Sequence, residues 1–365
     1  MKSILLASAS AFAFAGAAAA DGHSGVTFGG SATLGFNDVV EDGFYYDANL
    51  GVTFSAALDN GLTASATFDV DVADDASSID LESANYLLTL ESDMASLRFG
   101  DVDPAADDMW SGVDGSEVAG FNDYDTHIDT AGFEAVLRGD VMLGSLLGGG
   151  TDAMVAVSFG ADVDGGNDLT GDTIDALQVA ASGSFGAFGV MAAFQQEFGP
   201  TPQIIAVAAT ASFAGADLKV AYEDDGTESS IGGSVAYPIG PVTLGGYYTE
   251  NTNAGGAYGV SAAYASGPIG VDVAYDVDAG EDAGEGEISA DATYAVGSGI
   301  TILAGGSQDL GTEITTFYGA ATYDLGGGAT FLVAYADDGV DGNANDEVGG
   351  PEYNEGITAE LSFEF

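Results

Sequence analysis

The sequence predicts an all-β fold, and more specifically a transmembrane antiparallel β-barrel of 16–20 strands. Three observations lead to this prediction. Runs of about 8–13 residues alternate apolar and polar side chains and end at Gly, Asp or Asn. Tight turns alternate along the chain with longer, more acidic connections, which is the layout of membrane-spanning β-barrels. After residue 20, no apolar run approaches the ~18 residues that mark a membrane-spanning helix.

Turn residues delimit the first strands. We expect them at 25–37, 44–58, 61–72, 82–91 and 96–100. The second and third form a hairpin around Asn60-Gly61, because a type I′ turn needs positive φ at both central positions and Asn-Gly meets that need.

Hairpins recur after an interruption of about thirty residues. The expected pairs are 131–143 with 152–161, 174–184 with 187–197, 203–213 with 216–223, 229–238 with 241–250, 256–265 with 268–277, 286–295 with 300–308 and 314–323 with 329–336, followed by a last strand at 355–365. The count favours twenty strands, an even number that places both termini on the short-turn side. One wrongly assigned hairpin would leave eighteen strands and two would leave sixteen.

The alternation separates a wetted face from an apolar face. In the last strand Ile357, Leu361 and Phe363 share one face, while Glu360 and Glu364 share the other. A charge facing lipid costs about 2–4 kcal/mol near the midplane of a bilayer, so charges of spanning strands should face water. A soluble β-sandwich or β-solenoid also alternates, but open sheets rarely exceed ~10 strands without splitting.

The basic residues obey this phase. Arg98 alternates with Leu97 and Phe99, and Arg138 and Lys219 are each in phase with neighbouring carboxylates. We therefore expect all three side chains to face the lumen, with Lys219 as the lumen-facing base of its strand.

The interruption at residues 101–130 is the segment around which the fold is organised. It holds the only Trp of the chain, Trp110, together with eight Asp and one Glu. Loops longer than about 12–15 residues are uncommon and are usually functional or disordered. We expect this one to fold into the barrel as a constriction loop. The residues expected at the pore constriction are Asp101, Asp103, Asp107, Asp108, Asp114, Glu117, Arg98 and Arg138.

The N-terminus reads as an export signal. Lys2 supplies a positive start, residues 4–16 are apolar, and Ala18-Ala19-Ala20 fits a cleavage site. We therefore expect a signal peptide at 1–20 and one barrel domain at 21–365. The formal net charge is −54, which excludes nucleic acid as a partner because nucleic acid needs a basic surface. The chain has no Cys, so disulfides and thiolate metal sites are excluded.

Three stretches resemble the general diffusion porins of Gram-negative outer membranes, especially the alphaproteobacterial ones. The stretches are residues 86–101, the acidic loop that follows them, and the end of the chain from Ala320 to Phe365. The resemblance implies outer-membrane localisation, contact with lipid and lipopolysaccharide, a homotrimer, and a terminal Phe365 that the barrel-assembly machinery reads. This chain differs from the family pattern in two features. The family usually has sixteen strands, whereas the count here favours twenty. The family also places a cluster of Arg across the pore from the acidic loop, whereas after residue 20 this sequence has only Arg98, Arg138 and Lys219.

The function predicted is a water-filled channel for passive diffusion of ions and small hydrophilic solutes, with a preference for cations. No nucleophile motif, phosphate-binding loop or H-E-x-x-H pattern is present, so we predict no enzyme and no required cofactor. The alternative is a secreted or surface acidic β protein that binds Ca²⁺ and forms no pore. Its candidate ligands are Asp341, Asn343, Asn345 and Glu352, which carry oxygen side chains at positions 1, 3, 5 and 12 of a run.

Overall fold

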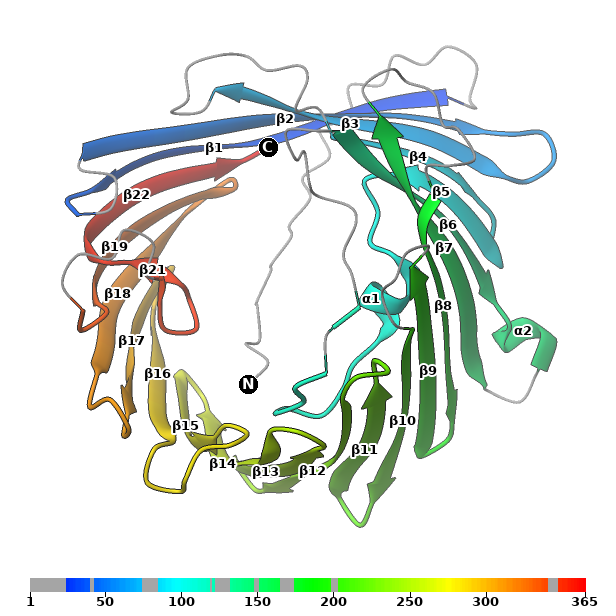
Figure 1. Cartoon of the computed structure of the whole chain (residues 1–365). Helices are drawn as coiled ribbons and strands as arrows, with labels where there is room; N and C mark the ends of the chain where they lie inside the picture. Colours follow the sequence, from blue (N-terminus) through cyan, green and yellow to red (C-terminus); the bar gives the residue numbers. More distant parts are fainter. Residues whose placement is uncertain are drawn as a thin grey trace.

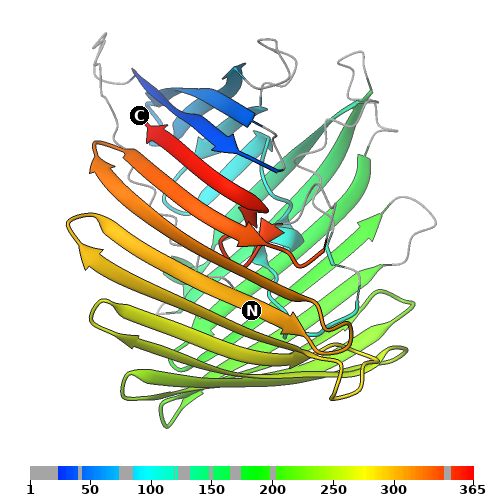
Figure 2. The ribbon, with the colours of Figure 1, turned by 90° about the vertical axis from the view of Figure 1, so that its left-hand side faces the viewer.

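The computed structural model describes residues 24–39, 43–73, 85–118, 120–121, 132–147, 151–164, 174–197, 203–340 and 347–365. Within these ranges, twenty strands form one antiparallel sheet that closes on itself (Figures 1 and 2). Closure occurs because β1 (Ser24–Asn37) pairs with both β2 (Gly43–Ala57) and β22 (Gly356–Glu364). The prediction of a barrel with twenty strands is confirmed.

Each strand pairs with its neighbours in chain order, and β19 pairs with β22. The remaining barrel strands are β3 (Thr63–Ala73), β4 (Asn85–Glu91), β5 (Ala95–Gly100), β6 (Gly132–Met142), β7 (Asp152–Asp164), β8 (Ile174–Phe185), β9 (Phe188–Glu197), β10 (Ile204–Phe213), β11 (Ala216–Asp224), β12 (Ser229–Ile239), β13 (Val242–Asn251), β14 (Gly255–Ser266), β15 (Ile269–Val277), β16 (Glu287–Gly297), β17 (Ile300–Asp309), β18 (Thr315–Gly326) and β19 (Ala329–Asp337). A separate two-stranded hairpin joins β20 (Glu347–Val348) to β21 (Tyr353–Asn354), and the helices are α1 (Ala105–Met109) and α2 (Gly144–Leu147).

The turns at one end of the barrel are short except for the β6–β7 connection, which holds α2, and most of the longer connections lie at the other end. The turn Ala214-Gly215 has φ values of 53° and 86°, the positive pair of a type I′ turn whose twist matches that of the flanking strands. Both ends of the described chain lie on the short-turn side. Ser24 faces Ala56 next to the turn before β3, and the Glu364 N–H donates to the carbonyl of Gly328 in the turn after β18.

Successive side chains of each strand alternate between the outer and the inner face of the barrel. Leu97 and Leu137 are exposed on the outer face, while Arg138 between such neighbours is only 2% exposed. Val220 is 59% exposed, and the adjacent Lys219 donates inward to Ser111. In β22, Ile357 is exposed and Thr358 is buried. The phase read from the sequence is therefore the phase of the barrel wall.

None of the helices in the described ranges is both long and apolar enough to cross a membrane. The 101–130 segment is less irregular than the sequence indicated, because it contains the short helix α1. Residues 122–130, with His127, lie outside the described part of the chain.

The wall parity gives a matched test. Ala321 and Thr322 are neighbours near the middle of β18, where Ala321 continues the outward phase of Phe317 and Tyr323. We expect Ala321→Arg to destabilise the barrel by about 2–4 kcal/mol, because the charge must enter hydrocarbon. We expect Thr322→Arg to change stability by about 0.5 kcal/mol or less, because its side chain stays in the aqueous lumen. Urea unfolding in lipid vesicles measures both, and equal effects would contradict this wall assignment.

Candidate functional site

Side chains of the barrel wall accept hydrogen bonds from the N–H groups in the first turn of helix α1. The N–H groups at the start of a helix have no partner inside the helix. Here the Ala105 N–H donates to Oγ of Ser158 at 2.8 Å, and the Ala106 and Asp107 N–H groups donate to Oε1 of Gln178 at 2.7 and 3.1 Å. Ser158 belongs to β7 and Gln178 to β8, so side chains of two neighbouring strands cap the helix.

These acceptors belong to one inward-facing row that crosses adjacent strands at the same level. Arg98 on β5 is paired in register with Arg138, and Arg138 is paired in turn with Ser158. The row continues to Gln178 and Gln195, and Nε2 of Gln178 donates to Oε1 of Gln195 at 2.9 Å. The row holds the helix through neutral amides and a hydroxyl, which keep their hydrogen bonds without needing a counter-charge.

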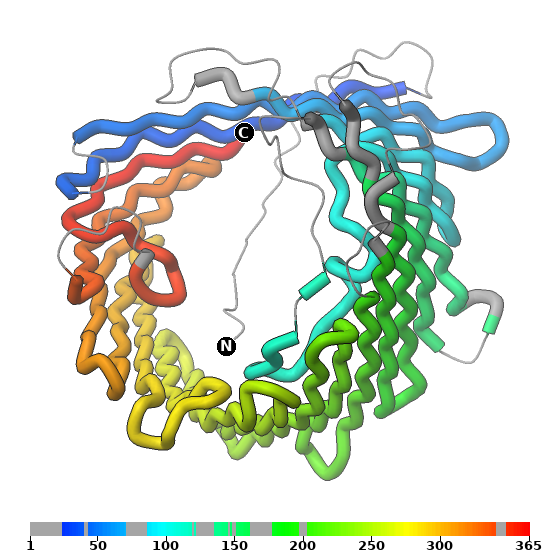
Figure 3. The backbone as a smooth tube through the Cα atoms, in the orientation of Figure 1, coloured from blue at the N-terminus to red at the C-terminus, as the bar shows by residue number. Residues whose placement is uncertain are grey.

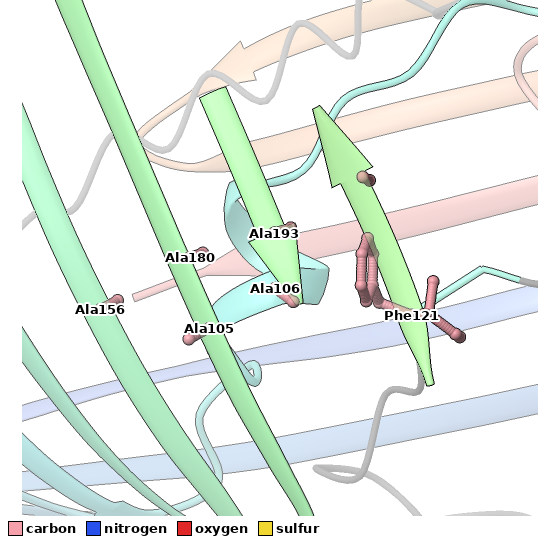
Figure 4. Packing of buried hydrophobic residues seen from close by; sticks show 8 residues of the cluster. Ala105, Ala106, Phe121, Ala156, Ala180 and Ala193 are labelled. Carbon is pink, nitrogen blue, oxygen red and sulfur yellow. The ribbon is translucent and has the colours of Figure 1, made fainter. Parts of the chain in front are cut away.

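Small apolar side chains bring α1 close to the wall, as Figure 4 shows. Ala105 and Ala106 are fully buried. They belong to a cluster with Ala156, Ala180, Ala193, Ile204, Ala206 and Phe121. Trp110 packs edge-on against Phe121 with ring centroids 6.3 Å apart. The alanine surface of β7 to β10 therefore provides an apolar contact surface on the inner wall.

Arg138 ties the same segment to the wall by charge. Its Nη2 lies 2.6 Å from Oδ2 of Asp108, its Nε donates to Oδ1 of Asp140 at 2.9 Å, and its Nη1 donates to the Asp103 carbonyl at 2.8 Å. The Ser96 hydroxyl completes the cluster by donating to Oδ2 of Asp140. A buried guanidinium is tolerated only when it is paired and hydrogen-bonded, and two carboxylates meet that need here.

A second set of contacts holds the part of the segment that follows α1. Nζ of Lys219 donates to Oγ of Ser111 at 2.7 Å, and the Ser116 hydroxyl donates to Oε2 of Glu223 at 2.9 Å. Both wall residues belong to β11. The basic residue expected to face the lumen therefore contacts the segment directly.

Two residues of β13 hold the segment by its backbone. The Thr249 hydroxyl donates to the Asp114 carbonyl at 2.7 Å, and Nδ2 of Asn251 donates to the Gly115 carbonyl at 2.8 Å. Oδ1 of Asn251 also accepts from the Glu117 N–H at 3.0 Å. The anchors Ser158, Gln178, Gln195, Glu223, Thr249 and Asn251 were not identified from the sequence. Their signal was a polar residue in the inward phase of a strand, which many other positions share.

Residues 101–118 thus follow one side of the inner wall from β5 to β13 (Figures 1 and 3). Of the acidic residues expected at a constriction, Asp103, Asp108, Asp114 and Glu117 are exposed, while Asp101 and Asp107 are half-buried. Arg98 and Arg138 both lie in the wall row beside the start of the segment. The narrowing of a conducting pore by this segment remains a prediction.

Tyrosines fix carboxylates on the inner face elsewhere. The Tyr45 hydroxyl donates to Oε2 of Glu360 at 2.8 Å across Gly35, which is paired in register with both residues. A Cβ at Gly35 would overlap the Tyr45 ring, so only glycine lets the ring lie flat on the wall. A matching arrangement links Tyr318 to Asp291 at 2.6 Å across Gly305, and Tyr247 to Asp276 across Gly259.

The remaining predicted residues lie outside this site. Asp341, Asn343 and Asn345 fall outside the described residues, whereas Glu352 lies in the turn between β20 and β21 with φ of 58°. In the described ranges, no group of three or more His, Asp or Glu is arranged to hold a metal ion. Phe365 exchanges two backbone hydrogen bonds with Gly30, at 2.9 and 3.3 Å.

The chain belongs to the Gram-negative porin family, because the sequence model of that family matches residues 7–343. It is therefore an outer-membrane protein of a channel class. No curated protein matches the chain. Among solved structures, two mutants of the Rhodopseudomonas blastica porin each share 13% identity with it and cover 93% of this chain and 100% of their own, with TM-scores of 0.45 and 0.44.

The Arg138 cluster yields a stability prediction. We expect Arg138→Met to destabilise the barrel by about 3–5 kcal/mol, because Asp140 would stay buried without a counter-charge. The single Trp of the chain, Trp110, lies on the segment that Arg138 holds, so its emission should shift to longer wavelength. Urea unfolding followed by Trp fluorescence measures both effects.

The control is the double variant Arg138→Met with Asp140→Asn, which removes the uncompensated buried charge. It should be less destabilised than the single variant, since loss of both partners costs less than loss of one. A double variant as unstable as the single one would show that the buried carboxylate is not the cause.

Proposed function

We propose that this porin forms a water-filled, cation-preferring channel for passive diffusion of ions and small hydrophilic solutes across the outer membrane. The observation that supports the preference is the sign of the lumen charge. Exposed carboxylates at Asp103, Asp114 and Glu117 face the lumen from the anchored segment. The basic residues beside them are few, and Arg138 is matched by two carboxylates.

The position of the basic residues argues against a transverse field of acid against base. After a signal peptide at 1–20, the only Lys and Arg would be Arg98, Arg138 and Lys219. All three belong to strands β5, β6 and β11, on the side of the ring that the segment follows. The tyrosine-held carboxylates Asp291 and Glu360 lie on the other side. A solute therefore passes between two acidic surfaces.

The energy between a carboxylate and a passing ion decides whether the lumen charges affect permeation in the presence of salt. One charge about 5 Å from a passing ion contributes roughly 0.8 kcal/mol in water. Screening at 0.15 M, where the Debye length is ~8 Å, reduces this to about 0.4 kcal/mol. That value changes the local cation concentration about twofold for each carboxylate. Several carboxylates along one lumen with low-dielectric walls therefore concentrate cations relative to anions.

Charge removal on the anchored segment tests the proposal. Asp114 and Glu117 contribute backbone atoms to the anchors, so Asp114→Asn with Glu117→Gln should leave the fold intact. We expect the cation-to-anion permeability ratio to fall at least about twofold. The reversal potential in a planar bilayer under a salt gradient measures it. Asp108 is less suitable because its carboxylate pairs with Arg138.

The matched control is Asp93→Asn, an exposed carboxylate in the short turn between β4 and β5. It should leave the reversal potential unchanged. If the wild-type channel favours anions, or if both variants behave alike, the charge proposal is wrong even though the channel stands.

The assembly that accompanies this function is also a proposal. We propose a homotrimer embedded in lipid and lipopolysaccharide, with Phe365 recognised by the barrel-assembly machinery. The exposed apolar outer wall supports contact with lipid and with neighbouring subunits alike. Cross-linking in native outer membranes should give a band of three subunits, and a monomer alone would contradict the trimer.

No cofactor is needed for the proposed channel, and Ca²⁺ on the acidic loops would be an accessory. We expect EDTA to leave the single-channel conductance unchanged at constant ionic strength, because the carboxylates of the lumen attract monovalent cations as well. Planar-bilayer recordings before and after chelation measure this. A loss of conductance restored by Ca²⁺, but not by Mg²⁺, would instead support a calcium-dependent pore structure.

A further inference from the structure

The hairpin of β20 and β21 is folded into the barrel. It belongs to the long connection between β19 and β22, and Figure 1 shows β21 inside the ring of strands. Val348 is 2% exposed and packs in one cluster with Tyr318 and Ala336 of the inner wall. The rings of Tyr353 and Tyr318 lie 5.4 Å apart. The hairpin is therefore seated on the wall by an apolar contact, as α1 is.

The seat depends on one close approach. Gly349 has φ of 76°, and a Cβ there would overlap the Tyr318 ring. Tyr318 is itself held in place, because its hydroxyl donates to Asp291. The neighbouring Gly350 has open space around it. The hairpin therefore contacts the wall at Gly349, whereas the next residue, Gly350, faces open space.

The turn at residues 349–352 carries a carboxylate, that of Glu352. The Glu352 N–H donates to the Gly349 carbonyl at 3.0 Å, which closes a four-residue turn. Glu352 is exposed and has φ of 58°. Figure 1 draws the hairpin inside the ring, so the turn that carries Glu352 borders the lumen.

The ring places the hairpin opposite helix α1 of the anchored segment. Helix α1 contacts β7, β8 and β9, and the hairpin contacts β18 and β19. In a closed sheet of twenty strands, β18 is ten strands from β8 in either direction. The two inward structures therefore face each other across the lumen.

We propose that residues 347–354 form the second side of the pore constriction and that Glu352 is one of its selectivity-determining residues. This inference rests on the proposed channel function and names a site within it. A permeating ion would pass between Glu352 and the exposed carboxylates of the anchored segment, of which Asp103 lies beside α1 and Asp114 and Glu117 lie beside β13, five strands from β18. With the same sign on both sides, the field attracts cations throughout the gap instead of dividing it into a cationic and an anionic lane.

Cysteine modification tests the position of Glu352, and the chain has no Cys of its own to interfere. The variants are Glu352→Cys and the control Glu313→Cys. Glu313 is also exposed, has φ of 62° and lies in a long-side connection, at 310–314. A cationic methanethiosulfonate reagent added during planar-bilayer recording converts each position to a positive charge.

We expect modification of Glu352→Cys to lower the conductance and to reduce the cation-to-anion permeability ratio at least about twofold. Modification of Glu313→Cys should change neither, since Glu313 lies in the connection between β17 and β18 and not in the hairpin. Equal responses of the two variants would overturn the second side of the constriction while leaving the channel intact. Absence of any channel in the unmodified protein would instead overturn the proposed function.

A steric test does not depend on charge. Gly349→Val should lift the hairpin from Tyr318 and change the single-channel conductance, whereas Gly350→Val, one residue away, should leave the hairpin seated and the conductance close to that of the wild type. Heat-modifiable migration on a gel verifies that both variants fold. If both fold and conduct like the wild type, the hairpin does not bound the pore.

Discussion

Closure of the sheet is the constraint on which the rest of this structure depends. A membrane supplies no water to pair backbone N–H and C=O groups, so a sheet that spans it must have no free edge. The pairing of β1 with β22 removes the last two edges, and Phe365 extends it through its bonds to Gly30. Once the cylinder is closed, each strand has one wet face and one apolar face, and parity decides which residues face the lumen.

The lumen is then a surface on which further chain can be seated. Two segments use it in the same way, through an apolar contact with the inner wall. Helix α1 rests on alanines of β7 to β10 and takes its caps from Ser158 and Gln178. The hairpin of β20 and β21 rests on Tyr318 and Ala336. Both contact surfaces are built on paired strands of the barrel.

The position of each charged side chain in the lumen is set by its ion-pair and hydrogen-bond partners. Arg138 is buried, and its two carboxylate partners remove its field from the pore. Asp291 and Glu360 accept hydrogen bonds from tyrosines and stay on the wall. The glycines Gly35 and Gly305 make room for those rings. The acidic excess of the sequence is thereby held in place around the lumen.

The sequence by itself determined the barrel strands, favoured twenty of them within a range of 16–20, and determined the face of Arg98, Arg138 and Lys219, because a period of two is a local property that neighbouring residues display. It also indicated that residues 101–130 interrupt the barrel. Only the tertiary structure decided what that segment rests on, since Ala105 and Ser158 are 53 positions apart and no local pattern links them. The same holds for residues 347–354, whose sequence suggested a calcium loop at 341–352 and whose seat on Tyr318 exists only after the sheet has closed.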